Sequence, residues 1–435
     1  MNSGNDAAEV LRAEVREWLE VNWRDDLLLG DWWSRLADAG LAFPTWPTGM
    51  GGRGMTRKDA RVIAGELASA GALGPPGGVG QMMGGPVIIE YGTSEQRCRW
   101  VPALAAGAES WCQLFSEPGA GSDLASLALR AERDGDGWVL TGQKLWSREA
   151  DTADRGLILA RTDTAVPKHE GISFFVVDLD QPGVEVRPIR QMNGRATFNE
   201  VFLTGVAVPA ENLIGAEGQG WPLVRASLAY ERQEVGGAGE LHFARIAVPG
   251  RRGGMLNRPI CELAAEHRRA EQDRPNITGT RTPTAMISLA RQLGRVADPV
   301  VRQRLMVMYA MADANRLRVE RARAAAGRGQ RPGPEASIGK LIGSALGRHA
   351  RDLGLSLLGA EGLLAGNDAF EGGVFQQMAL SVQSLSIAGG TDEIQHNLIG
   401  ERVLGLPREP EVGQGVPFRE LKTGTQRAEP RAATP

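Results

Sequence analysis

Hydrophobic residues recur at helical spacing along the first hundred residues of the chain. One apolar stripe comprises Leu11, Val15, Trp18 and Leu19, and a second comprises Trp33, Leu36 and Leu41. Residues three and four positions apart lie on one face of a helix, and an apolar face has to be buried against another element. The pattern therefore predicts an N-terminal helical domain over residues 1–110.

Between residues 111 and 222 the apolar period changes to two, which is the period of a half-buried strand. The strand-like runs are residues 137–141, 156–161, 172–177, 184–189 and 201–208. Short runs at regular spacing, joined by polar turns, are typical of a compact antiparallel barrel or sandwich. We expect a middle β domain over residues 111–222.

Helical spacing returns from Trp221 onward. One stripe comprises Val301, Leu305, Met308 and Ala312, and another comprises Ile338, Leu341, Ile342 and Leu346. Because each amphipathic helix needs a partner for its apolar face, we expect a helical bundle over residues 223–407.

Two segments depart from this pattern. Residues 245–281 are rich in Pro, Gly and Arg, a composition that favours a solvated excursion over a phosphate-facing loop. After Pro407 the chain consists mainly of Pro, Glu, Arg, Thr and Gly, with few large apolar residues. This composition predicts a disordered tail over residues 408–435.

Composition and charge exclude several classes of function. A chain of 435 residues is long enough for two or three lobes, and its net charge of −3 reflects Lys and Arg residues dispersed among acidic ones. A nucleic-acid partner is therefore not expected. The N-terminus lacks the pattern of a signal peptide, and no window reaches about 18 apolar residues. We expect no membrane partner and a cytoplasmic location.

Cysteine and histidine positions argue against a metal site. The cysteines are Cys98, Cys112 and Cys261, and the histidines are His169, His242, His267, His349 and His396. Neither set has the spacing of zinc ligands, and an odd number of cysteines fits a reducing cytosol better than a disulfide framework. We therefore expect no bound metal.

A strand-like run ends on small and polar residues between Trp111 and Asp123. Gly119 and Gly121 permit a close approach of the backbone, and Ser116 and Ser122 supply hydroxyl groups. On these residues alone, an ordinary Gly-rich turn explains the pattern as well as contact with a large flat ligand does.

Several motifs in order resemble the acyl-CoA dehydrogenase family. They lie at residues 113–123, 142–146, 198–215, 387–395 and 401–407, and the resemblance covers most of residues 8–407. It implies an α+β fold with an N-terminal helical domain, a middle β domain and a C-terminal four-helix bundle. It also implies FAD, bound between the β domain, the bundle and a neighbouring subunit.

The resemblance further implies which residues contact the cofactor and the substrate. The residues expected to contact FAD are Gln113, Leu114, Phe115, Ser116, Ser122, Trp146, Ser147, Arg148, Gly390, Thr391 and Glu393. Among them Trp146 would pack against the isoalloxazine, and the helix start at Thr391 suits the phosphate and ribose end. The residues expected to contact the acyl-CoA are Ser122, Tyr230, Arg232 and Gly389.

Chemistry in this family requires a base beside the thioester. A proton leaves the carbon next to the carbonyl, and a hydride passes from the following carbon to the flavin. Most members carry the base just before Gly-Thr in the C-terminal motif, where this chain has Gly389. A subset carries a Glu before an Arg on a bundle helix, and Glu231 before Arg232 matches that position. The predicted base is Glu231.

The implied reaction is α,β-dehydrogenation of an acyl-CoA to the 2-enoyl-CoA, with electrons passed to an electron-transferring flavoprotein. The missing side chain at Gly389 leaves space near the acyl carbons. We therefore expect a branched, cyclic or otherwise bulky acyl group.

Three departures from the family pattern keep alternatives open. Arg148 replaces a small Thr or Ser, Ser356 replaces a Gln, and residues 245–281 stand where an Arg-x-x-Phe-Gly segment is usual. They motivate a second hypothesis, a catalytically deficient structural subunit of a heteromeric enzyme. A third is a flavin oxidase or monooxygenase on the same fold. A homotetramer, a homodimer and a heterotetramer with a related subunit all fit.

Overall fold

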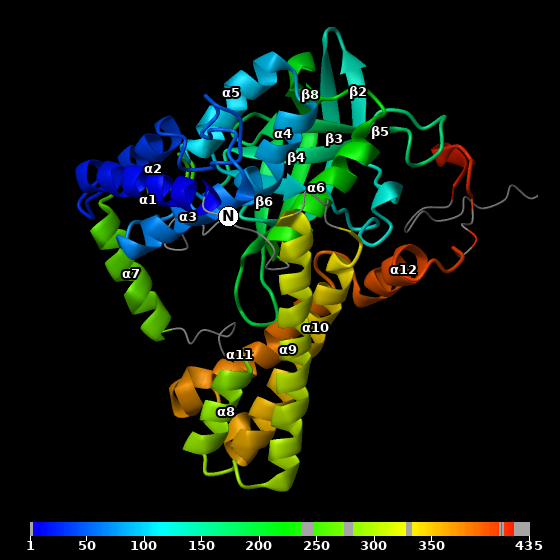
Figure 1. Cartoon of the computed structure of the whole chain (residues 1–435). Coiled ribbons are helices and arrows are strands. Elements are labelled where there is room, and N and C mark those ends of the chain that lie inside the picture. Colours follow the sequence, from blue (N-terminus) through cyan, green and yellow to red (C-terminus); the bar gives the residue numbers. More distant parts are fainter. Residues whose placement is uncertain are drawn as a thin grey trace, which may run out of the picture.

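The apolar stripes of the N-terminal segment are the buried faces of packed helices (Figure 1). The computed structural model describes residues 3–235, 248–273, 282–327, 333–408, 410 and 413–421. The first elements are α1 (Ser3–Asn22), α2 (Leu29–Asp38), α3 (Arg57–Ser69), a π-helical turn (Gly80–Gly84), α4 (Gly85–Tyr91) and α5 (Ser94–Ala105). Val15 and Leu19 of α1 pack in one core with Trp33 and Leu36 of α2, all at most 4% exposed. These contacts confirm the two predicted stripes.

The middle of the chain forms a single sheet. Its strands are β1 (Trp111–Leu114), β2 (Arg130–Asp134), β3 (Gly137–Arg148), β4 (Arg155–Arg161), β5 (Ile172–Asp178), β6 (Val184–Ile189), β7 (Phe198–Val208) and β8 (Leu213–Ile214). Within the described residues the order is β6-β7-β3-β2-β4-β5-β8, with β1 also paired to β4. Most pairs are antiparallel as predicted, but β1 runs parallel to β4, a feature that apolar periodicity cannot reveal.

The alternation of side chains along β4 and β5 divides the core in two. Leu157 and Phe174 face the core shared with the N-terminal helices, whereas their neighbours Ile158 and Phe175 face a second core within the β domain. Both faces of these two central strands are therefore buried, which explains why their sequences are nearly continuous apolar runs.

The C-terminal helices form a separate bundle, seen at the bottom of Figure 1. Its helices are α8 (Pro283–Gln292), α9 (Pro299–Gly327), α10 (Ala336–Leu358) and α11 (Val374–Ser381), and α12 (Asp392–Arg402) lies against α10. By contrast, α6 (Gly220–Val235) packs on β5 and α4. The predicted stripe of α9 is confirmed by the buried Val301, Leu305 and Met308.

The predicted stripe of α10 is wrong at three of its four positions, because only Leu346 packs against the bundle core. Ile338, Leu341 and Ile342 are half-exposed, and the buried face carries small residues such as Ser344 and Gly347, followed by Leu353 and Leu357. Small residues permit close approach of neighbouring elements. At Gly354 of α10, a Cβ atom would lie 2.2 Å from the Phe375 ring of α11.

The Arg-rich segment is not a solvated excursion where the structure describes it. Residues 248–273 contain α7 (Ile260–Asp273), whose Ile260 and Leu263 are 3% exposed in the N-terminal core. The Ile260 N–H donates to the Leu27 carbonyl at 3.0 Å. The prediction was wrong here because a few apolar positions decide the docking, and the many Arg residues conceal them. Residues 245–247 and 274–281 lie outside the described residues.

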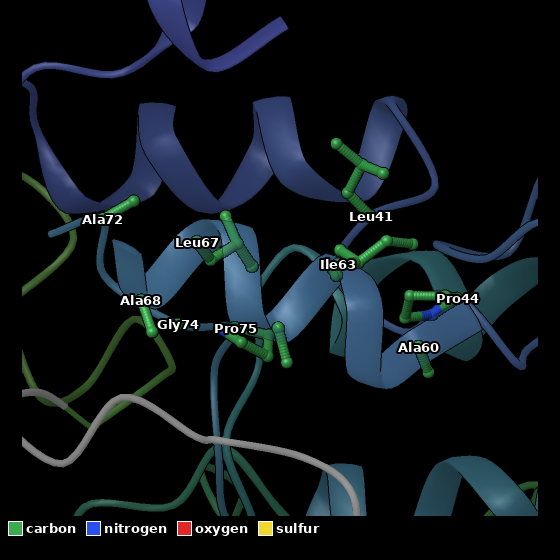
Figure 2. A pocket seen from close by; sticks show the side chains of 11 residues that line it. Leu41, Pro44, Ala60, Ile63, Leu67, Ala68, Ala72, Gly74 and Pro75 are labelled. Atoms are coloured by element: carbon green, nitrogen blue, oxygen red, sulfur yellow. The ribbon is translucent and has the colours of Figure 1, made fainter. Parts of the chain in front are cut away.

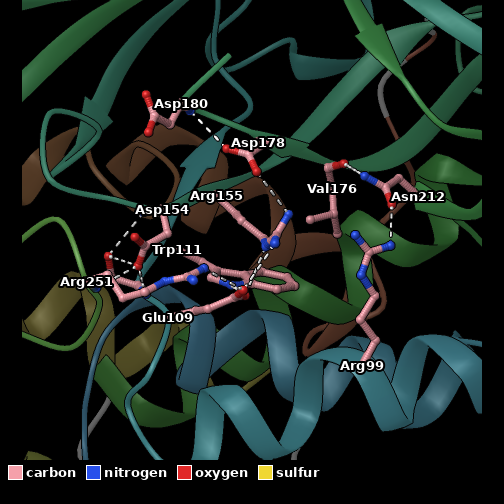
Figure 3. Close-up of polar contacts among 11 residues, drawn as sticks. Arg99, Glu109, Trp111, Asp154, Arg155, Val176, Asp178, Asp180, Asn212 and Arg251 are labelled. Atoms are coloured by element: carbon pink, nitrogen blue, oxygen red, sulfur yellow. Dashed lines mark hydrogen bonds and ion pairs between the residues drawn. The ribbon is translucent and has the colours of Figure 1, made fainter. Parts of the chain in front are cut away.

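The same segment is tied to the start of β1 (Figure 3). The Asp154 carboxylate accepts the backbone N–H groups of Ser110 at 2.8 Å and Arg251 at 3.2 Å. Gly250 has a φ of +98°, and a Cβ atom there would lie 2.4 Å from the Ser110 hydroxyl. The Glu109 carboxylate also binds the Arg155 guanidinium at 2.9 Å. These contacts fix the strand that leads into the predicted cofactor loop.

The predicted disorder after Pro407 is wrong for residues 413–421. Phe418 is 7% exposed and begins a 3₁₀ turn, Phe418–Glu420, beside the β domain. A single aromatic residue is enough to dock a segment of otherwise polar composition. Residues 422–435 lie outside the described part of the chain.

Candidate active site

A cleft of about 1260 Å³ lies where the β domain, α6 and α12 meet. Its walls include residues 122–125 and 167–170 of the β domain, residues of α6 between Trp221 and Ala229, and Ile394, Leu398, Glu401 and Arg402 of α12. Pockets for drug-sized ligands measure roughly 300–1,000 Å³, so this cleft has room for a longer ligand. It brings the predicted Ser122 opposite the helix that carries Glu231.

The loop that carries Ser122 is held by a buried ion pair that the sequence analysis missed. Lys144 is fully buried, and its Nζ lies 2.7 Å from the Glu117 carboxylate. Glu117 also accepts the backbone N–H groups of Ala128 at 2.7 Å and Leu129 at 3.0 Å. Burial lowers the pKa of Lys144, and Glu117 opposes that change. The available signal was a Lys within an apolar strand, whose partner lies 27 residues away.

Trp146 is turned out of the sheet near the end of β3. The register of β3 against β7 shifts between Lys144 and Ser147, and Trp146 has a φ of +61°. A sparsely populated conformation of this kind costs about 1–3 kcal/mol, and irregular strands often re-aim side chains beside active sites. The indole is 55% exposed and makes a T-shaped contact with Phe198. It offers a flat surface on which a planar ligand can stack.

The end of β1 lies beside Trp146. The N–H of Leu145 donates to the Ser116 carbonyl at 2.9 Å, which joins the two segments. Gln113 and Ser116 are half-buried. The structure therefore brings together the strand end and the aromatic residue that the resemblance assigned to the flavin.

Three of the predicted cofactor contacts have buried side chains. Leu114 and Phe115 are at most 3% exposed and belong to the two cores. Ser147 is fully buried, and its hydroxyl has no hydrogen-bond partner among the described residues. As they stand, these residues offer a ligand their backbone atoms only.

Arg148 does not cover the indole. Its guanidinium carbon lies 5.8 Å from the Phe198 ring centroid, and its Nε lies 3.4 Å from the Glu149 carboxylate. The side chain is 59% exposed. The Arg that replaces a small residue is thus compatible with an accessible Trp146.

Glu231 lies on α6 just beyond the part that lines the cleft. Val224 and Leu228 line it, and Glu231 follows Leu228 by three residues on the same helical face. Tyr230 anchors α6 to α4, because its hydroxyl donates to the Glu90 carboxylate at 2.5 Å.

Two other predicted substrate contacts, Arg232 and Gly389, stay predictions. The side chain of Arg232 lies outside the described residues, and Gly389 is not among the described residues that line the cleft. A Cβ atom at Gly389 would meet nothing within 4 Å, so the space beside it is open.

The start of α12 combines two left-handed glycines with a cap. Gly389 and Gly390 have φ values of +67° and +88°, and the Thr391 hydroxyl accepts the Ile394 N–H at 3.3 Å. The backbone N–H of Glu393 and the Thr391 hydroxyl lower the pKa of Glu393. Gly390, Thr391 and Glu393 lie just before the residues of α12 that line the cleft.

Asp392 anchors this turn to the bundle and was also missed. Its two carboxylate oxygens lie 2.8 Å from Lys340 Nζ and 2.8 Å from Arg348 Nη1, both on α10. Burial alone would raise the pKa of Asp392, but the hydrogen bonds from Lys340 and Arg348 hold it well below its usual range. The position of the predicted cofactor turn therefore depends on a charged Asp392.

The stabilising effect of Asp392 should depend on pH. A carboxyl with a depressed pKa in the folded state contributes its full stability above the ordinary Asp pKa of about 3.9, and loses it as the pH falls further. We expect the thermal midpoint difference between wild type and Asp392→Asn to be constant from pH 5 to 8 and to shrink below pH 4. A difference that grows on acidification would contradict this linkage.

A second, smaller cavity lies in the N-terminal domain (Figure 2). It measures about 130 Å³ and is lined by α3 residues, including Ile63 and Leu67, and by the segments around Leu41 and Pro75. Its lining is apolar and without titratable groups. It offers no chemistry of its own.

Comparisons with known proteins agree with this architecture. The models of the acyl-CoA dehydrogenase N-terminal, middle and C-terminal domains match residues 5–108, 112–206 and 284–404. Acyl-CoA dehydrogenase IpdE1 of Mycobacterium tuberculosis is 34% identical, over 92% of this chain and 98% of its own length. Acyl-CoA dehydrogenase FadE34 of the same organism is 39% identical over 86% of this chain, which spans about half of that longer protein (46%).

Solved structures lead to the same family. The steroid acyl-CoA dehydrogenase Tcur3481-Tcur3483 superposes with a TM-score of 0.66 at 27% identity, covering 93% of this chain and 98% of that one. The ChsE4-ChsE5 complex from Mycobacterium tuberculosis gives 0.63 at 26% identity, with the same coverage. The chain belongs to the acyl-CoA dehydrogenase family. It is an oxidoreductase that acts on a CH–CH bond of an acyl-CoA, in a family of flavoproteins.

Proposed function

We propose that this protein binds FAD and dehydrogenates an acyl-CoA thioester with Glu231 as the base. The observation that carries the proposal is the cleft itself. Its α6 wall leads through Val224 and Leu228 to Glu231, and its opposite wall carries Ser122. A thioester in the cleft would pass between a hydroxyl of the β domain and a carboxylate of α6.

The residues around Trp146 fit a flavin. An exposed indole in a strained conformation stands beside the half-buried Gln113 and Ser116, where a planar ring would cover it. Bound FAD would supply the hydride acceptor. Trp146 would orient the ring, and the N-terminus of α12 would face its phosphate and ribose end.

The remaining steps belong to this chain's own residues. The Glu231 carboxylate takes the proton from the carbon beside the thioester carbonyl, while the next carbon gives up its hydride and the 2-enoyl-CoA results. The backbone N–H of Gly389 hydrogen-bonds the thioester oxygen, on which negative charge develops. Electrons then pass to an electron-transferring flavoprotein.

The acyl group that we propose is branched, cyclic or otherwise bulky. The open space beside Gly389 supports this choice, and so does the similarity to the steroid acyl-CoA dehydrogenase Tcur3481-Tcur3483. Anaerobic titration with a panel of acyl-CoA thioesters, followed at the flavin absorption band, tests the proposal. We expect bulky thioesters to bleach the flavin at lower concentrations than short straight-chain ones, and the reverse order would contradict this choice.

Assembly gives a second candidate. The structural neighbours ChsE4-ChsE5 and Tcur3481-Tcur3483 carry paired names, which favours a heteromer with a related subunit over a homodimer or homotetramer. In that case the chain would complete a partner's site. A yellow protein that an acyl-CoA bleaches without a partner supports the enzyme; a colourless protein that gains FAD only with a partner supports the structural subunit.

The location that we propose is the cytoplasm. No helix in the described part of the chain has both the length and the apolarity needed to cross a lipid bilayer. Membrane and soluble fractions of cells that express the protein would test this expectation.

A further inference from the structure

We infer that the C-terminal segment 413–421 is a wall of the substrate cleft and holds the coenzyme A end of the ligand. The inference rests on the proposed function, because it takes the cleft to be the acyl-CoA site. Gly413, Gln414 and Gly415 line that cleft, although the matched family domain ends at residue 404. The segment thus contributes to the cleft from outside the matched family domain.

Phe418 anchors the segment to the β domain. It is 7% exposed, and the Arg161 guanidinium lies 3.8 Å from the centroid of its ring. The Phe418 N–H donates to the Val166 carbonyl at 2.9 Å, and the Arg419 N–H donates to the Thr164 carbonyl at 3.0 Å. The red segment beside the β domain in Figure 1 is held in this way.

Arg161 connects this anchor to the loop that carries Ser122. It is 2% exposed and donates to the carbonyls of Ala125 at 2.6 Å, Leu127 at 3.1 Å and Lys168 at 2.6 Å. One guanidinium thus contacts two walls of the cleft and stacks on Phe418. Arg161 and Phe418 are positioning residues, since they act on the cleft through the segments that they hold.

The segment lies far from the base. The loop to which it is tied continues to His169, whose ring is 4.7 Å from that of Trp221 at the start of α6. Glu231 follows Trp221 by ten residues, which is about 15 Å along a helix. If the reacting carbons lie at Glu231, the part of the ligand beside residues 413–415 is the coenzyme A portion rather than the acyl group.

The charges at this end agree with a phosphate-bearing ligand. Arg402 and Arg408 line the cleft together with Lys168. Arg408 is 72% exposed, although its Nε lies 3.1 Å from the Glu401 carboxylate, and Lys168 Nζ lies 3.1 Å from the Asp123 carboxylate. Arg408 and Lys168 can each exchange the carboxylate partner for a phosphate group of the ligand.

Calorimetric titration of the FAD-loaded protein with free coenzyme A tests the inference. We expect Phe418→Ala to weaken binding about tenfold, the ratio that about 1.4 kcal/mol produces. Gln414→Trp should weaken it similarly, because Gln414 is exposed at the lip and a large ring there narrows the cleft while Phe418 stays docked. The matched control is Glu420→Gln, an exposed neighbour of Phe418 in the same turn that does not line the cleft, and it should bind within twofold of wild type.

The outcomes separate the inference from the proposed function. Wild-type affinity in both Phe418→Ala and Gln414→Trp overturns the inference and leaves the proposed function standing. A wild-type protein that does not bind coenzyme A overturns the proposed function, and the inference with it. If Phe418→Ala lowers the thermal midpoint so far that it cannot be titrated, Gln414→Trp decides alone.

Discussion

Replacing Glu231 by Gln is expected to slow the bleaching of the flavin by acyl-CoA at least a hundredfold, about the lower bound for general-base catalysis, while FAD stays bound. Gln has the size and the hydrogen-bonding reach of Glu but cannot accept the proton. General-base catalysis contributes about 10²–10⁴-fold, so the rate of flavin reduction should fall by about that factor. Anaerobic stopped-flow absorbance gives the rate, and the ratio of flavin to protein absorbance shows whether the cofactor is retained.

Two further variants make this experiment decisive. Glu231→Asp keeps the carboxylate but withdraws it by one methylene, so its rate should lie between those of wild type and Glu231→Gln. Glu217→Gln removes an exposed Glu that pairs with Arg133 shortly before α6, and it should reduce the flavin at the wild-type rate. An undiminished rate in Glu231→Gln would show that another group is the base.

The helices and strands could be predicted from the local sequence pattern, but the elements against which they pack could not. Val301, Leu305 and Met308 lie at helical spacing and are buried, because together they form the apolar face that α9 packs against its neighbours. On α10 the same rule failed for Ile338, Leu341 and Ile342, since the face of Ser344 and Gly347 is buried instead, where helices can approach closely. Composition likewise concealed the docking of Phe418, a single aromatic residue in a polar segment.

The candidate site could likewise be predicted from the sequence only in part. The motifs pointed to Ser122 and to the helix of Glu231, and the structure places both at one cleft; the roles of these residues stay predictions. The ion pairs that support the site could not be predicted from the sequence. Lys144 pairs with Glu117, 27 residues away along the chain, and Asp392 pairs with Lys340, 52 residues away. No local sequence pattern reveals such pairings.

The supporting ion pair leads to the second large effect, which is the loss of stability in Glu117→Ala. This change leaves the fully buried Lys144 with one remaining acceptor, the Phe115 carbonyl at 3.1 Å, and leaves the N–H groups of Ala128 and Leu129 without the carboxylate. Removing one partner of a buried pair costs about 3–5 kcal/mol, because a buried charge is left uncompensated. Urea unfolding followed by circular dichroism should show a loss of this size.

The reciprocal variant should be milder, and this asymmetry tests the explanation. In Lys144→Met the Glu117 carboxylate keeps two backbone donors, so its charge remains compensated and the apolar Met fills a site that is already dry. The surface pair Glu185–Arg187 has the same 2.7 Å separation but is more than half exposed, and Glu185→Ala should leave the unfolding midpoint nearly unchanged. Equal losses in all three variants would mean that charge pairing alone, rather than burial, sets the cost. A loss confined to Glu117→Ala would mean that the Glu117 carboxylate itself, rather than its pairing with Lys144, holds the loop that carries Ser122. Coenzyme A should then bind more weakly to that variant as well.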